Sequence, residues 1–190
     1  MKPLRADSSA LIFIGTAAAV WAHPGHGPHF GAAAGFLHPL TGWDHALAMI
    51  AVGLWASQLG APWLLSGTCL AMLSLGTVLG HWAGPISGVE QGVAASLLVL
   101  GLLIEGAVQL PAAISVAMIA LFALFHGLAH GVALPANAAA LQYCLGFLAA
   151  TALLLVTGIA LGSVASGRFS LATRIAGVGI AVAGVILLAG

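Results

Sequence analysis

Six long apolar segments, each almost free of charge, constrain this chain more than any other feature of its sequence. Short stretches rich in glycine, proline or polar residues separate them, and they cover residues 42–59, 62–82, 86–108, 111–130, 136–163 and 171–189. Five of them are close to the roughly 20 residues that an α-helix needs to cross about 30 Å of hydrocarbon, and the segment 136–163 is longer. Because 62% of the residues are hydrophobic and only 4% are charged, the chain cannot give a soluble domain a polar surface. We therefore predict an all-α polytopic membrane protein, folded as a compact bundle of six transmembrane helices in a lipid bilayer.

Several local patterns predict where these helices begin and how they pack. Thr41, with Asp44 three residues later, fits a capping box, and Pro62 and Pro111 suit a first helical turn. Connections of only a few residues predict that consecutive helices lie adjacent and antiparallel. Small residues spaced four apart favour close helix packing, and they occur as Gly76/Gly80, Gly88/Gly92, Gly127/Gly131 and Gly158/Gly162.

The amino-terminal segment has the pattern of an export signal. Lys2 and Arg5 precede an apolar run over residues 10–20, and Val-Trp-Ala ending at Ala22 resembles a cleavage site. We predict a signal peptide over 1–22, a histidine-containing periplasmic segment over 23–40 and the six-helix transmembrane domain over 41–190; a retained peptide acting as an extra anchor is the alternative. The loop with Arg168, near Arg174, would then be cytoplasmic, as the positive-inside rule requires, which favours the bacterial inner membrane.

Side chains that bind metals stand out in this nearly uncharged chain. With alternating helix directions, the predicted topology puts seven of them at the periplasmic ends of helices: His38, Asp44, His45, His81, Glu90, His126 and His130. His126 and His130 are four residues apart, so they share one helical face and can present two imidazoles to one ion. Asp44 has a competing role in the capping box and can also orient His45.

Three further histidines lie in the short segment HPGHGPH: His23, His26 and His29. This segment either captures metal at the entrance or simply solubilises the chain. Glu105, at the opposite end of the third segment, is either an exit ligand or an acid that extends to the membrane surface. Imidazole nitrogen with one or two carboxylate oxygens suits Ni²⁺ or Co²⁺, and also Zn²⁺ and Cu²⁺.

Composition also restricts the function. With four basic residues and a formal net charge of zero, the chain has no patch for nucleic acid, and it has no glycine-rich phosphate loop for ATP. We predict a carrier of divalent metal ions that has no enzymatic activity and no resident cofactor. Assembly into a homo-oligomer is left open. An intramembrane zinc hydrolase, with Asp44 or Glu90 as general base, and a metal-sensing accessory protein are the alternatives.

Two motifs carry a resemblance to a known family. HPLTGWDH followed by ALAMIAVGLWA, together with the later FHGLAHG, resembles the HupE/UreJ proteins, membrane permeases associated with hydrogenase and urease. The resemblance implies uptake of nickel first and cobalt second, from periplasm to cytoplasm, for metalloenzyme maturation. It implies that the ion contacts His38, Asp44, His45, Glu90, His126 and His130. The second motif of the family usually continues to a glutamate, whereas Ala133 stands here.

Overall fold

The computed structural model describes residues 31–134, 139–164 and 170–190, and these form seven α-helices. In chain order the helices are α2 (Ala32–Thr41), α3 (Trp43–Gln58), α4 (Pro62–Ala83), α5 (Val89–Glu105), α6 (Ala112–Val132), α7 (Ala140–Val164) and α8 (Leu171–Ala189). The all-α class is therefore confirmed, and α3 to α8 correspond to the six predicted segments. The predicted signal peptide and the tail histidines His23, His26 and His29 lie outside the described residues.

Helix α2 was not predicted, and its presence changes how α3 begins. Thr41 is the last residue of α2, and its hydroxyl donates to the carbonyl of His38 at 3.0 Å. Gly42 is the N-cap of α3 and no side chain caps that end. The predicted capping box of Thr41 and Asp44 is therefore wrong, because Thr41 is already engaged in the preceding helix. Asp44 still lies in the first turn of α3, where a negative charge favours the helix dipole.

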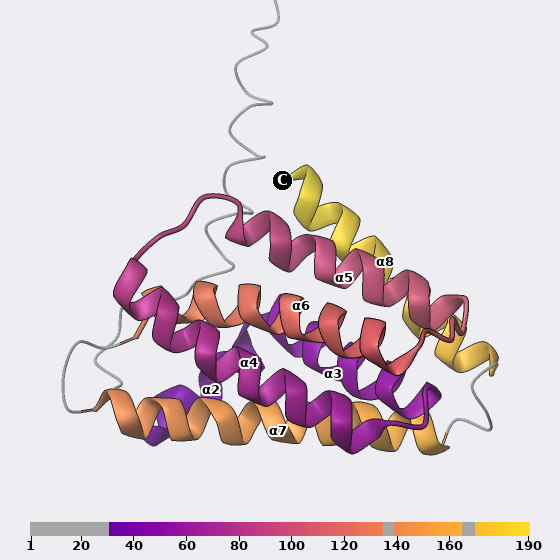
Figure 1. Ribbon diagram of the computed structural model, residues 1–190, viewed down its shortest axis with the longest axis horizontal. Helices are drawn as coiled ribbons and strands as arrows, with labels where there is room; N and C mark the ends of the chain where they lie inside the picture. The colour runs from indigo at the N-terminus through magenta and orange to yellow at the C-terminus, as the bar shows by residue number, and fades with distance from the viewer. Residues whose placement is uncertain (1–30, 135–138, 165–169) are drawn as a thin grey trace, which may run out of the picture.

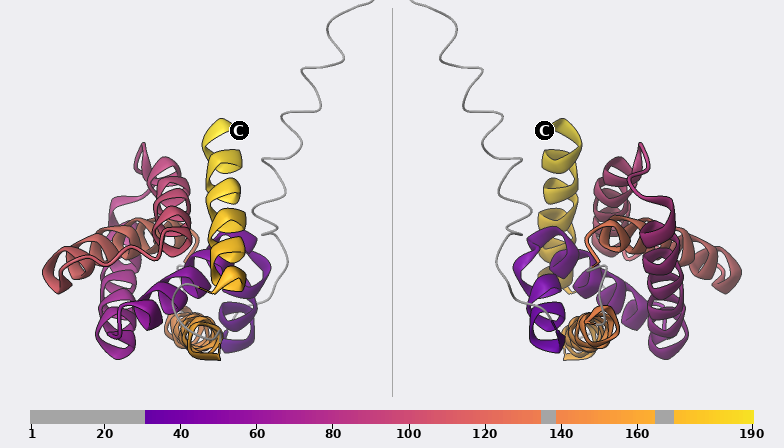
Figure 2. Two further views of the ribbon diagram at one scale, coloured as in Figure 1. Left: turned by 90° about the vertical axis from the view of Figure 1, so that its right-hand side faces the viewer. Right: turned by 90° about the vertical axis from the view of Figure 1, so that its left-hand side faces the viewer.

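The pairing of helices differs from the prediction that neighbours in sequence pack together. Consecutive helices such as α3 and α4 do touch, but every helix packs most extensively against one that is not consecutive: α4 against α6, α5 against α8, and α7 against both α3 and α2 (Figure 1). Seen along α7 in Figure 2, α8 stands at a steep angle to it. Short connections thus fix the direction of each helix without fixing its main partner.

Glycines explain which helices pair. A side chain at Gly76 of α4 would meet backbone atoms of Leu124 and Gly127 in α6, and one at Gly131 would meet the backbone of Thr77. Later residues of α4 thus contact later residues of α6, so the two helices run parallel. Such close approach is what small residues four apart allow. The predicted packing role of Gly76/Gly80 and Gly127/Gly131 is confirmed, and Gly158 contacts α3 in the same way.

Helix α3 is the centre of the bundle. Most of its residues are buried, and Trp55 and Ala51 have no exposed surface. It has 16 residues, so it is about 24 Å long. By length and composition, four helices among the described residues are candidate membrane spans, namely α4, α6, α7 and α8. The six-span count therefore stays a prediction, because α3 and α5 are shorter than these four.

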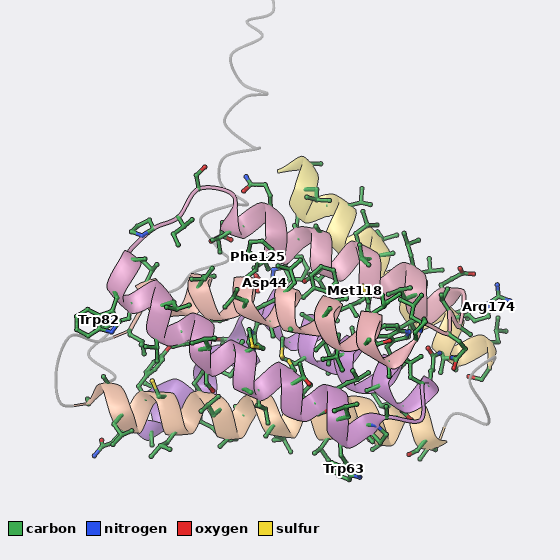
Figure 3. All side chains as sticks on the ribbon, in the orientation of Figure 1. Asp44, Trp63, Trp82, Met118, Phe125 and Arg174 are labelled. Carbon is green, nitrogen blue, oxygen red and sulfur yellow. The ribbon has the colours of Figure 1, made fainter. Side chains whose placement is uncertain are left out.

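The two ends of the bundle carry different polar groups. At one end Arg174, in the first turn of α8, donates to the Glu105 carboxylate at 2.8 Å and to the Glu105 carbonyl at 3.2 Å. The candidate metal ligands gather toward the other end, where α2, α4 and α6 end and α3, α5 and α7 begin. Figure 3 shows Trp82, next to His81, and Arg174 at opposite ends of the long axis. The directions of the helices agree with those predicted, and metal binding at these ends stays a prediction.

Candidate metal centre

Three histidines from two helices form a cluster that can hold one metal ion. His45 is in the first turn of α3, and His126 and His130 are in the last two turns of α6. One ring nitrogen from each lies within 4.8 Å of the others. His126 and His130 lie one helical turn apart, as predicted. His45, which is 81 residues earlier than His126, adds the third imidazole.

The imidazoles form a connected chain. His130 Nε2 lies 2.9 Å from His45 Nδ1, and His130 Nδ1 lies 3.0 Å from Nε2 of His38, which comes from α2. The His38 and His130 rings meet edge to face, with centroids 4.9 Å apart, and the His45 and His130 rings do the same at 4.6 Å. His130 therefore links α2 to α3 through its two ring nitrogens.

Two hydroxyl groups contact the outer nitrogens of the buried rings. Nε2 of His126 lies 3.0 Å from Ser96 Oγ on α5, and Nε2 of His45 lies 3.3 Å from Thr151 Oγ1 on α7. Both hydroxyl-bearing residues are fully buried. A buried imidazole whose second nitrogen has a partner has a fixed ring orientation, which is typical of metal-binding histidines.

An aromatic ring closes the cluster on the side of α7. Phe147 is 2% exposed, and its ring centroid is 4.8 Å from that of His130 and 5.3 Å from that of His45. Packing of this kind restricts the imidazoles to few rotamers and keeps water from their faces. On this side, the cluster is therefore bordered by an apolar ring.

The side chains of the site become more buried from the helix ends toward the interior of the bundle. His38, Asp44 and His130 are partly exposed, whereas His45 and His126 are 1% and 2% exposed. The Asp44 carboxylate interacts electrostatically with His126, so an acidic side chain lies near the cluster. A divalent ion in this cluster would gain Coulomb energy from the charge of that side chain, and more so where water is excluded.

Two predicted ligands lie apart from the three-histidine cluster. His81 is exposed at the end of α4, and its ring packs against Trp82 with centroids 6.2 Å apart. Glu90 is exposed in the first turn of α5 and lines a pocket of about 290 Å³. Ala133, where the resemblance noted above leads us to expect a glutamate, lines the same pocket. Metal contact by His81 and Glu90 stays a prediction.

Sequence reasoning missed Ser96, Thr151 and Phe147. Ser96 and Thr151 are isolated polar residues inside long apolar segments, and polar residues kept in a membrane helix often line a path or a site. That signal was available, but it also fits a hydroxyl whose role is to bond its own helix, as Thr77 does to the Leu73 carbonyl at 2.8 Å; Ser96 makes such a bond as well, to the Val93 carbonyl at 2.6 Å. Only the assembled fold separates the two cases.

The fold and the cluster define a class of protein, namely helical membrane proteins with a candidate transition-metal site between their helices. Comparison with known proteins agrees with that class. The family model described as HupE / UreJ protein matches residues 11–187, so the chain belongs to the HupE/UreJ family. It is 41% identical over 163 residues to Protein HupE of Rhizobium leguminosarum bv. viciae, a match that covers 84% of this chain and 85% of that protein. No solved structure is significantly similar to it.

Proposed function

We propose that this protein carries a divalent transition-metal ion, nickel first and cobalt second, from the periplasm to the cytoplasm by secondary transport or facilitated diffusion. The ion is the substrate and serves the maturation of metalloenzymes. The observation that carries this proposal is the cluster of His45, His126 and His130, whose ring nitrogens lie within 4.8 Å of one another inside an apolar helical bundle. Imidazole nitrogens suit nickel and cobalt, and also zinc and copper, so competition among these ions is part of the test.

The gradient of burial supports entry from the end of the bundle where the histidines gather. The ion would first meet the partly exposed Asp44, His38 and His130, and would then move to the buried His45 and His126. The carboxylate draws the cation in, and the neutral imidazoles replace its water ligands one by one. This order lowers the cost of removing water from a doubly charged ion before it enters the bundle.

The tryptophans of α4 support a position for the bilayer. Trp63 and Trp82 are 74% and 83% exposed, in the first and last turns of α4. Their Cα atoms are about 28 Å apart along the helix, which matches a hydrocarbon thickness of about 30 Å. Exposed tryptophans favour the two membrane surfaces. We infer that α4 spans the bilayer between them, with the histidine end periplasmic and Arg174 at the cytoplasmic surface.

The alternative of an intramembrane zinc hydrolase gains no support from the comparisons, since the family and the relative that match are named as HupE and UreJ proteins. Transport therefore stands as the proposed function.

Uptake of radioactive nickel into proteoliposomes, with Co²⁺ and Zn²⁺ as competitors, tests the proposal. We expect the intact protein to carry nickel, and His45→Ala and His130→Ala each to abolish uptake at unchanged abundance in the membrane. Thr77→Val is the matched control, because Thr77 is buried on α4 and its hydroxyl bonds within its own helix. Normal uptake by either histidine variant, or no uptake by the intact protein, would contradict the proposal.

A further inference from the structure

We infer that Ser96, Thr151 and His38 are positioning residues that determine which nitrogen of each clustered imidazole binds the metal. This inference rests on the proposed function and deepens it. A histidine binds metal through a nitrogen that carries a lone pair, so the proton of the neutral ring must sit on the other nitrogen. Each of the three rings has a partner at its other nitrogen, and each partner comes from a different helix: α5, α7 and α2.

Ser96 determines the tautomer of His126. The Ser96 hydroxyl donates to the carbonyl of Val93 at 2.6 Å, a short bond that uses its one hydrogen. Its oxygen therefore accepts from Nε2 of His126, at 3.0 Å. The proton of His126 is then on Nε2, and Nδ1 is the nitrogen left to bind metal.

Thr151 allows the proton of His45 to move away from Nδ1, so that Nδ1 can bind the metal. The 2.9 Å separation between His45 Nδ1 and His130 Nε2 requires a hydrogen between the two nitrogens as long as no metal is bound. When an ion takes both lone pairs, His45 must carry its proton on Nε2, which faces the Thr151 hydroxyl at 3.3 Å. A hydroxyl both donates and accepts, so it serves His45 in either tautomer. The proton moves from Nδ1 to Nε2 of the same ring, and no net charge is gained or lost.

His38 does the same for His130. If Nε2 of His130 binds the ion, its proton lies on Nδ1, and Nε2 of His38 accepts it at 3.0 Å. Once the ion lies in the cluster, His38 orients the ligand His130 and does not itself bind the ion. The separation of 2.9 Å between the binding nitrogens of His45 and His130 also suits a metal, because two ligands with 2.1 Å bonds at a right angle lie about 3.0 Å apart. The cluster can therefore take up an ion by shifting protons within its rings, without releasing one.

Metal titration of the purified full-length protein in detergent tests this assignment, with Co²⁺ as the probe because its visible spectrum reports the ligands. We expect Ser96→Ala and Thr151→Val each to raise the Kd by 10- to 100-fold, and Thr151→Ser, which keeps the hydroxyl, to restore it. His38→Gln keeps an acceptor for His130 and should retain the Co²⁺ spectrum of the intact protein, whereas His38→Leu should weaken binding.

Two matched controls separate positioning from general damage. Ser115→Ala and Thr77→Val remove buried hydroxyls that bond to carbonyls of their own segments, and both should bind Co²⁺ like the intact protein. If the intact protein binds no Co²⁺, the proposed function itself fails. If it binds, but Ser96→Ala and Thr151→Val bind as tightly, the positioning role is refuted. A spectrum altered equally in His38→Gln and His38→Leu would instead make His38 a ligand.

Discussion

The contact between α4 and α6 should control the geometry of the metal cluster, and Gly76→Ala tests this. A Cβ at position 76 would lie 2.5 Å from the Leu124 carbonyl oxygen and 3.0 Å from Gly127 Cα. Ordinary contact distances are about 3.5 Å, so the helices would have to separate by up to about 1 Å. Overpacking of this kind costs about 1–3 kcal/mol, and the better helix propensity of alanine returns about 0.5–1 kcal/mol. We expect a net destabilisation of about 0–2.5 kcal/mol.

The same separation should weaken metal binding, because α6 carries His126 and His130 while His45 lies on α3. Metal–ligand distances tolerate deviations of only about 0.2 Å, so we expect the Kd for Ni²⁺ to rise by roughly tenfold, about 1.4 kcal/mol. Calorimetric titration and detergent unfolding measure the two effects. Gly67→Ala is the matched control on α4, because nothing lies within 4 Å of a Cβ at position 67. Unchanged stability and unchanged affinity in Gly76→Ala would refute the reasoning.

Three further predictions concern other parts of the fold. Ala133→Glu places a carboxylate in the pocket that Glu90 lines, so it should tighten Ni²⁺ binding by calorimetry; an unchanged or weaker affinity would show that the pocket lies off the ion's path. Because the side chain of Arg174 is 53% exposed, Arg174→Gln should cost at most about 1 kcal/mol of unfolding free energy despite its bond to Glu105, and a loss of several kcal/mol would argue against solvent screening of this pair. Phe147→Ala removes a buried ring and should destabilise the protein by about 3–5 kcal/mol in detergent unfolding, so a loss below about 1 kcal/mol would mean that the ring is not packed as described.

The position of the cluster could be predicted from the sequence because it depends on simple geometry. Apolar segments of membrane length alternate in direction, so His45 at the start of one segment and His126 at the end of another must come to the same end of the bundle. The spacing of His126 and His130 then puts both imidazoles on one face of a helix. No knowledge of the packing partners is needed for this result.

The pairing of helices and the partners of the imidazoles could not be predicted in the same way. Pairing depends on matching small-residue faces, such as those of Gly76 and Gly127, and each face taken alone fits several partners. Ser96 and Thr151 are ordinary hydroxyl residues until α5 and α7 bring them to the rings of His126 and His45. The contact between His38 and His130 could not be predicted either, because it depends on helix α2, which was not predicted.

X-ray absorption at the nickel edge of the Ni²⁺-loaded protein tests the central claim most directly. The imidazole ring gives a distinct scattering pattern beyond the first ligand atom, so the number of bound histidines can be measured. We expect nitrogen ligands at about 2.1 Å with three imidazoles for the intact protein, and one imidazole fewer or no bound nickel in His45→Ala. A spectrum that His45→Ala leaves unchanged would contradict the claim that His45, His126 and His130 bind the ion.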